Sequence, residues 1–505
     1  MSNNKIIIFS LILWPYIYLF PHTLQIIEMG NDFELLYYSY KKYIFEFIRV
    51  GHFPKWLPTD SSGYSLIFNP FAQYFYPLSW ILYSISALVG DLSKYLFWLY
   101  TVFGLSIYNI GQYLWLRAIK IEIKYAFIAT LITCSGLKLT EILRFTNAVH
   151  AIAWLPWILL GITLSVQKNK KIYSYLIIFA STLMLFTAGY PYYIFYGAIL
   201  CSIYFLFLLS TKVKTVLFEL EIKNFNINLR FFFNCFIPSI ISLLIVSPWF
   251  FKIGEIMKIT TSRNLIDIKF SSILNSNYID QLGSWVFPPF ALAEGWYYFG
   301  IINTILILIF FLSFFLLKNI NSKKEKLILI FFLVLFIVNF QFASAENSFL
   351  FRFFWENLDF LKNFRIFSRM NIILIPIFSI LIALALKKIA ENEYGFTKIT
   401  SKSIFLIITP IIFIIVLQIY FIEISNFKNI YWDAWQLKRI IFASDQITYL
   451  SKVFLSHDNY WYLFFTLISF VFLLLYSKIK KQLVIPFILF LTFSELFILS
   501  NLQWA

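Results

Sequence analysis

The sequence predicts an all-α, polytopic integral membrane protein with about 13 transmembrane helices. Hydrophobic residues make up 60% of the 505 positions and charged residues 13%, whereas about a quarter of the residues in soluble domains are charged. Apolar stretches of roughly 17 to 25 residues recur along the whole chain, and each is long enough to cross a hydrocarbon core. Short clusters of lysine and arginine separate many of these stretches, as expected for the cytoplasmic loops of a membrane protein.

The basic clusters orient the predicted spans. Placing the short basic loops inside puts four longer loops, rich in aromatics and mixed charge, on the outer face: 28–93, 252–298, 343–370 and 424–460. The first apolar stretch has no small-residue cleavage site after it, which indicates an uncleaved anchor with the N-terminus in the cytoplasm. We expect one transmembrane domain over residues 1–505, with spans near 6–25, 94–117, 125–143, 150–167, 172–188, 191–210, 231–251, 299–317, 327–343, 371–388, 403–423, 461–477 and 483–500.

The apolar segment 66–89, inside the first outer loop, is predicted not to cross the membrane. A crossing there would move every later basic cluster to the wrong side. Its central part, 69–77 (NPFAQYFYP), contains two prolines and two amide side chains, which suit a re-entrant or surface-lying segment. The first outer loop should therefore carry surface or re-entrant helices.

Charge and cysteine content exclude other classes. The net charge of +16 comes from loops between spans, so it reflects membrane topology and gives no support for nucleic-acid binding. The three cysteines, Cys134, Cys201 and Cys235, lie in or at the edge of apolar segments and form no Cys-x-x-Cys motif. Neither a disulfide framework nor a thiolate metal site is expected.

Carboxylates are scarce in this chain, yet Glu28, Asp32 and Glu34 follow the first span closely. This position puts them at the water–lipid boundary, where a lipid-borne substrate could be met. A carboxylate in a partly apolar pocket can have a raised pKa and act as a general base. The competing interpretation is that these acids solvate a loop and interact favourably with the first turn of a surface helix. The residues themselves leave both interpretations open.

His52 and Asp60 lie further along the same loop, in turn-rich stretches where polar groups could converge. His52 could shuttle a proton or bind substrate, or it could be a loop residue with a satisfied hydrogen bond. The four histidines show no metal-ligand spacing, which argues against a dedicated metal site. A weakly bound divalent cation, Mg²⁺ or Mn²⁺, at Asp32 and Asp60 stays open.

Five later positions on the predicted outer face are candidate substrate-binding groups. Arg144 lies between the third and fourth spans, Tyr190 lies in a tight turn between the fifth and sixth, and Glu294 precedes the eighth, where it could line a sugar site. Arg365 and Arg369 are four residues apart, so at a helix start both guanidinium groups could face one phosphate. The alternative is that arginines flanking a span only reach toward lipid headgroups.

With these residues in view, the chain resembles the YfhO-like bacterial membrane proteins of the polytopic GT-C superfamily of glycosyltransferases. The resemblance rests on four places that follow in the same order: 30–33 (GNDF), 62–77, 153–161 (AWLPWILLG) with the turn at 189–191, and 364–369 (FRIFSR). It implies a polyprenyl-phosphate-linked sugar donor, a bacterial cytoplasmic membrane location, and transfer on the outer face to an envelope glycan, lipid or protein. Asp32 matches the superfamily's first-loop catalytic acid. Much of the superfamily has two adjacent acids there, whereas Asn31-Asp32 leaves Asp32 alone or helped by Glu34.

The first hypothesis is therefore an inverting, lipid-dependent glycosyltransferase. Asp32 would take the proton of the acceptor hydroxyl, and Arg365 and Arg369 would stabilise the leaving phosphate. The alternative is a transporter or flippase of a lipid-linked or amphipathic anion, which predicts ionisable residues along the spans. The predicted spans contain few, and Glu495 is the clearest. A third hypothesis is a structural partner in an envelope-assembly complex.

Overall fold

The computed structural model describes residues 3–30, 32–58, 63–167, 171–218, 226–259, 268, 278–283, 285–286, 297–316, 322–394, 396, 401–427 and 461–502, so most of the predicted outer loop 424–460 lies outside the described residues. Most of these residues are helical, and the strands among them are the short antiparallel pair β1 (Trp56–Leu57) and β2 (Tyr64–Ser65). The all-α class expected from the sequence is confirmed. The chain divides into two compact units.

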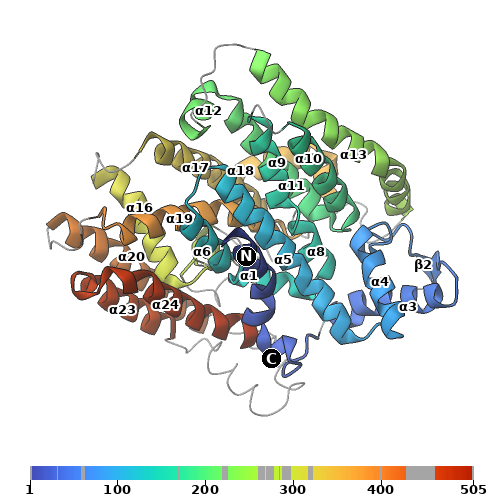
Figure 1. Cartoon of the computed structure of the whole chain (residues 1–505), viewed down its shortest axis with the longest axis horizontal. Helices are drawn as coiled ribbons and strands as arrows, with labels where there is room; N and C mark the ends of the chain where they lie inside the picture. Colours follow the sequence, from blue (N-terminus) through green and yellow to red (C-terminus); the bar gives the residue numbers. More distant parts are fainter. Residues whose placement is uncertain are drawn as a thin grey trace. The chain divides into compact units, whose positions relative to one another are not determined.

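The first unit comprises residues 1–120, 142–271 and 355–365. Within it, α10 packs between α9 and α13, and α13 lies at the edge of the view in Figure 1. Its elements are α1 (Asn3–Tyr18), α2 (Phe20–Thr23), η1 (Phe33–Tyr38), α3 (Ser39–Arg49), β1, β2, η2 (Pro70–Ala72), α4 (Pro77–Val89), α5 (Lys94–Ala118), η3 (Ile142–Arg144), α8 (Thr146–Ile152), α9 (Leu155–Ser165), α10 (Lys171–Thr187), α11 (Pro191–Leu209), α12 (Thr211–Phe218), α13 (Asn226–Ile259) and η8 (Asp359–Asn363).

The second unit comprises residues 121–141, 272–354 and 366–505. Its central helix is α19, which packs against α6 and α16 and is buried along almost its whole length, as expected of a helix that is hydrophobic all round. The elements are α6 (Ile123–Cys134), α7 (Leu137–Glu141), α15 (Tyr278–Gly283), α16 (Ile301–Leu316), α17 (Lys323–Ala343), η7 (Ala345–Asn347), most of α18 (Phe349–Asn357), η9 (Phe367–Leu374), α19 (Ile375–Ala390), α20 (Ser401–Phe427), α23 (Trp461–Leu474), η10 (Tyr476–Lys478) and α24 (Lys481–Leu502).

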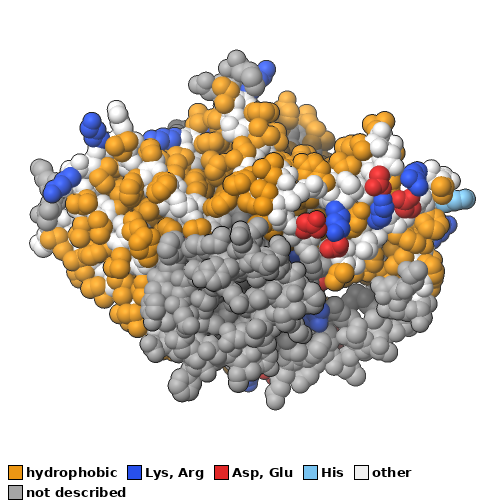
Figure 2. All heavy atoms as spheres, turned by 90° about the horizontal axis from the view of Figure 1, so that it is seen from below, with side chains coloured by type: hydrophobic (Ala, Val, Ile, Leu, Met, Phe, Trp, Pro, Cys, Tyr) orange, Lys and Arg blue, Asp and Glu red, His pale blue; other side chains and the backbone are white. Residues whose placement is uncertain are grey.

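The described helices have the apolar surfaces of a membrane-embedded protein. Seven of them are long and apolar enough to cross a membrane, or eight when the bent segment at 123–144 counts as one span. Helix occurs in each range predicted as a span, but the count of about 13 crossings stays a prediction. Figure 2 shows a broad hydrophobic surface on which acidic and basic side chains gather toward the right, the side where Figure 1 draws α3 and α4.

Helix α4 has an inverted pattern of polarity. It buries a face that includes Ser79 and Ser86 and exposes large apolar side chains, among them Ile81, Ile85 and Leu88. An apolar outer face suits contact with lipid, because only the inward side then offers hydrogen-bond partners. With 13 residues, α4 is about 20 Å long, too short for a hydrocarbon core of about 30 Å. These features support the prediction that segment 66–89 does not cross.

The buried carboxylate of Glu495, on α24, caps the N-terminus of α16. One oxygen accepts the Ile301 backbone N–H at 2.9 Å, and the other accepts the Tyr298 hydroxyl. One turn away, Asn303 Nδ2 donates to Thr492 Oγ1 at 2.9 Å. A negative group at a helix N-terminus satisfies an orphan N–H and interacts favourably with the helix dipole. Glu495, the clearest ionisable residue in the predicted spans, therefore stabilises the fold by capping a helix.

Replacing Glu495 with alanine should destabilise the second unit by about 1–3 kcal/mol, because the buried Ile301 N–H loses its acceptor. Thermal unfolding of the purified protein in detergent measures the effect. The matched control is Glu122→Ala, which removes an exposed ion pair with Lys387 worth about 0–1 kcal/mol. Equal melting temperatures for the two variants would contradict the capping role.

Candidate functional site

The acidic segment after the first span forms a π-helix, η1, with Asp32 at its N-cap position. π-Helical turns are rare and occur frequently at functional sites. Phe33 and Tyr37 are buried on one side of η1, and the Phe33 ring lies 4.9 Å from the ring of Phe97 on α5. Asp32 is half-buried and its side chain makes no capping hydrogen bond. Aromatic packing of the residues after Asp32 therefore fixes the position of the predicted base.

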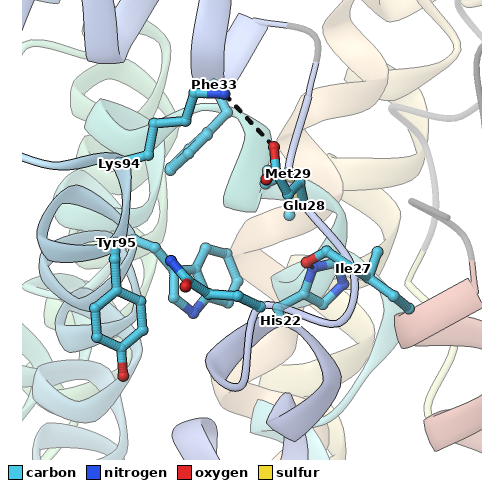
Figure 3. A pocket seen from close by; sticks show the side chains of 9 residues that line it. His22, Ile27, Glu28, Met29, Phe33, Lys94 and Tyr95 are labelled. Carbon is cyan, nitrogen blue, oxygen red and sulfur yellow. Dashed lines mark hydrogen bonds and ion pairs between the residues drawn. The ribbon is translucent and has the colours of Figure 1, made fainter.

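Lys94, the first residue of α5, joins the other two acids of this segment. Its Nζ lies 2.5 Å from Glu34 Oε1 and 3.5 Å from Glu28 Oε2. Figure 3 shows Lys94 and Glu28 facing each other at a small pocket that His22 and Tyr95 also line. The side chains are partly exposed, so each pair contributes at most about 1 kcal/mol. Glu34 is thereby engaged in an ion pair that holds η1 to the start of α5.

Aromatic contacts bring η1 to Arg144 and Tyr190. The ring centroid of Tyr37 lies 6.2 Å from that of Phe145, and the Arg144 guanidinium lies 4.4 Å above the same Phe145 ring. Phe145 in turn lies 6.4 Å from Tyr190. Arg144 and Tyr190 are both buried, and a ring face partly offsets the cost of desolvating the guanidinium. Two of the predicted binding residues and the helix that follows Asp32 thus form one aromatic cluster.

The turn before Tyr190 packs tightly against the first outer loop. Gly189 has φ +81°, and a Cβ there would lie 1.9 Å from the Pro70 carbonyl oxygen. The Asn147 amide donates to the Gly189 carbonyl at 2.6 Å, and the Gln73 amide donates to the Ala188 carbonyl at 2.8 Å. Only glycine combines the left-handed conformation with this close backbone approach. The short motif that carried part of the family resemblance therefore has a clear steric basis.

Lys41, on α3, is a candidate that the sequence analysis missed. It is only 1% exposed, and its Nζ donates to Ser79 Oγ at 2.6 Å and to the Ala72 carbonyl at 3.0 Å. Burial lowers the pKa of this amine well below its usual value. Ion pairs among the described residues include none with Lys41. The sequence did contain a signal for the burial of Lys41, because this residue shares a helix face with the apolar Ile44 and Phe45.

The other site residues predicted from the sequence differ in burial and in the unit to which they belong. His52 is exposed in the turn after α3, while Asp60 and Glu294 lie outside the described residues. Arg365 is half-buried in the first unit, and Arg369 is buried in η9 of the second.

The expected helix start carrying both arginines does not form. Ile366, between them, has φ +57°, and the 3₁₀ turn of η9 begins only at Phe367. A left-handed conformation is a genuine outlier for a β-branched residue and interrupts any helix through this point. The i, i+4 geometry assumed for the pair is therefore corrected, and a shared phosphate stays a prediction.

Neither family models nor curated proteins assign a function to this site. No family model matches the chain, and no curated protein matches it. Within the described part of the chain, no three His, Cys, Asp or Glu side chains gather so as to hold a metal ion. Since Asp60 lies outside that part, the weak cation site at Asp32 and Asp60 also stays a prediction.

A cavity of about 620 Å³ lies beside the Gly189 turn. Its walls come from segment 67–77, from α10 and from α13. The polar wall atoms are already used, since Trp249 Nε1 donates to the Ile67 carbonyl at 2.7 Å and Thr187 Oγ1 to the Leu183 carbonyl at 2.9 Å. Lys252 is the charged residue of the lining, and it pairs with Glu255 at 2.7 Å. The size is ordinary for a ligand pocket, and the surface suits a hydrocarbon chain.

Proposed function

We propose that the protein is a membrane glycosyltransferase that moves a sugar from a polyprenyl-phosphate donor to an acceptor on the outer face of the bacterial cytoplasmic membrane. The observation that carries the proposal is one cluster in the first unit: the π-helix after Asp32 packs through Tyr37 and Phe145 against the buried Arg144. An acid at the start of a helix that packs through aromatic rings against a buried cation, near an apolar cavity, suits a substrate with an anionic head and a hydrocarbon tail. The acceptor is an envelope glycan, lipid or protein.

The proposed chemistry is a single displacement with inversion. Asp32 takes the proton of the acceptor hydroxyl while that oxygen attacks the anomeric carbon of the sugar. The bond from this carbon to the phosphate oxygen breaks, and the lipid phosphate leaves with the electron pair. Base assistance of this kind contributes about 10²–10⁴-fold, and cations already in place stabilise the developing phosphate charge without reorganisation.

Arg144 and Arg365 are the cations of the first unit that fit this role. Arg144 is buried over the Phe145 ring. The Nε of Arg365 is buried and has no hydrogen-bond partner within the described residues. A buried donor without an acceptor costs about 1–3 kcal/mol, which an anionic oxygen of the substrate would offset. Phe364, the neighbour of Arg365, packs its ring on Phe195 of α11 at 5.1 Å and so anchors the segment.

Donor consumption tests the proposed function. Protein in lipid nanodiscs, supplied with radiolabelled sugar on polyprenyl phosphate and an envelope extract as acceptor, should release free polyprenyl phosphate and form a glycoside of inverted anomeric configuration. The control is the same preparation after heat denaturation. Passage of intact donor across a vesicle bilayer, with no sugar release, would instead indicate the flippase alternative.

A further inference from the structure

The two hydrogen bonds of Lys41 flank one wall of the apolar cavity. Phe75 and Pro77 both line the cavity. The Ala72 carbonyl lies just before them and Ser79 just after them, and Lys41 Nζ donates to both, at 3.0 and 2.6 Å. The amine thus ties down both ends of the segment that forms this wall. The rings of Tyr83 and Tyr100 lie 5.5 and 5.9 Å from the same nitrogen and close it off.

The same network continues to the wall that α10 contributes. Ser79 Oγ lies 3.1 Å from the Tyr100 hydroxyl, which donates to Gln73 Oε1 at 3.2 Å. The Gln73 amide then donates to the carbonyl of Ala188 at 2.8 Å. Ala188 directly follows Thr187, a cavity-lining residue at the end of α10. This chain of hydrogen bonds connects Lys41 to residues beside two walls of the cavity, and the bonds in such a chain strengthen one another.

An apolar residue at position 41 would fill this space without desolvating an amine. Burying an amine or ammonium group is costly unless it is hydrogen-bonded. Methionine would remove that cost, but it would also leave the Ala72 carbonyl and Ser79 hydroxyl without this donor. The lysine therefore contributes two directed hydrogen bonds, which position the segment and which a packed apolar side chain cannot make.

We propose that Lys41 is a positioning residue, which holds segment 72–79 so that the cavity accepts one hydrocarbon chain of a lipid phosphate. The nature of this ligand rests on the proposed function. The apolar character of the cavity does not depend on that function. It comes from the lining, which is apolar apart from hydrogen-bonded groups and Lys252.

Photolabelling in nanodiscs tests the inference, using polyprenyl phosphate that carries a diazirine in its hydrocarbon chain and no sugar. In the wild-type protein the label should attach to cavity residues such as Val246, and excess unlabelled polyprenyl phosphate should displace it. Lys41→Met should lower cavity labelling about tenfold, because methionine makes neither of the two hydrogen bonds to the wall. Lys41→Gln, which keeps two N–H donors, should recover part of the labelling.

The matched control is Lys42→Met, because Lys42 is partly exposed and pairs with Glu46 and Asp91; its cavity labelling should equal the wild type. Leu244, exposed on α13, is the internal reference for labelling by surrounding lipid. Equal cavity labelling in Lys41→Met and Lys42→Met would overturn the role of Lys41. So would a parallel loss at Val246 and Leu244 together with a lower melting temperature, since that pattern indicates a folding defect.

Displacement by phosphatidylglycerol as effective as that by polyprenyl phosphate would overturn the ligand class and identify an ordinary membrane lipid chain. Displaceable labelling in a protein that consumes no sugar donor would contradict the proposed function and leave the inference about Lys41 standing. Sugar transfer at the wild-type rate in Lys41→Met would overturn the inference and leave the proposed function standing.

Discussion

Replacing Asp32 with asparagine should lower the rate of sugar transfer by about 10²–10⁴-fold, the usual contribution of a general base. Asparagine has nearly the same shape but cannot accept the proton of the acceptor hydroxyl. The fold should persist, because η1 is held by the buried Phe33 and Tyr37. The initial rate of donor consumption in nanodiscs, measured beside the melting temperature, gives both quantities.

Glu34→Gln is the matched control for this variant. Glu34 lies on the same helix, and its exposed pair with Lys94 contributes at most about 1 kcal/mol of stability, so its rate should stay within a few-fold of the wild type. A wild-type rate in Asp32→Asn would exclude Asp32 as the base. Equal losses in the two variants would contradict the assignment of that role to Asp32 alone.

Replacing Gly189 with alanine should destabilise the first unit by about 2–5 kcal/mol. The added Cβ would lie 1.9 Å from the Pro70 carbonyl oxygen, and the residue already has φ +81°. Relief requires the first-loop segment to move away from the α10–α11 turn, which breaks the bond from Gln73 to the Ala188 carbonyl. Thermal unfolding in detergent should show a clearly lower melting temperature.

The variant Gly51→Ala separates the two causes of the lost stability, which are the clash with Pro70 and the strain of the positive φ. Gly51 has the same φ of +81°, but a Cβ there meets nothing within 4 Å. Gly51→Ala should therefore cost only the conformational strain, about 1 kcal/mol. A melting temperature for Gly189→Ala no lower than that for Gly51→Ala would show that the turn and Pro70 are not in tight contact.

The positions of the helices could be predicted closely because hydropathy is a local property. The range 94–117 coincides with the helix Lys94–Ala118, and the range 191–210 coincides with Pro191–Leu209, which is also apolar enough to cross a membrane. The short α4 also follows from local rules, since Pro77 sits at the first helical position and Gly90, with φ +91°, ends the helix.

The candidate site was predictable only in part. Asp32, Arg144 and Tyr190 stand out as polar or aromatic residues near the ends of predicted spans. The ring contacts through Phe145, which link Arg144 and Tyr190 to Tyr37, join residues far apart in the chain. Spacing along one helix was a poor guide for Arg365 and Arg369, because a single left-handed residue, Ile366, breaks the helix between them.

The sequence by itself determined the class of the protein, the order of its apolar helices and the acidic segment after the first of them. Composition and periodicity suffice for these features, since each depends on neighbours in the chain and on the surrounding lipid. Only the tertiary structure decided that Lys41 is buried while Lys42 is partly exposed, and that an apolar cavity forms beside the Gly189 turn. These depend on which distant carbonyls, hydroxyls and rings meet, and one-dimensional patterns do not contain that information.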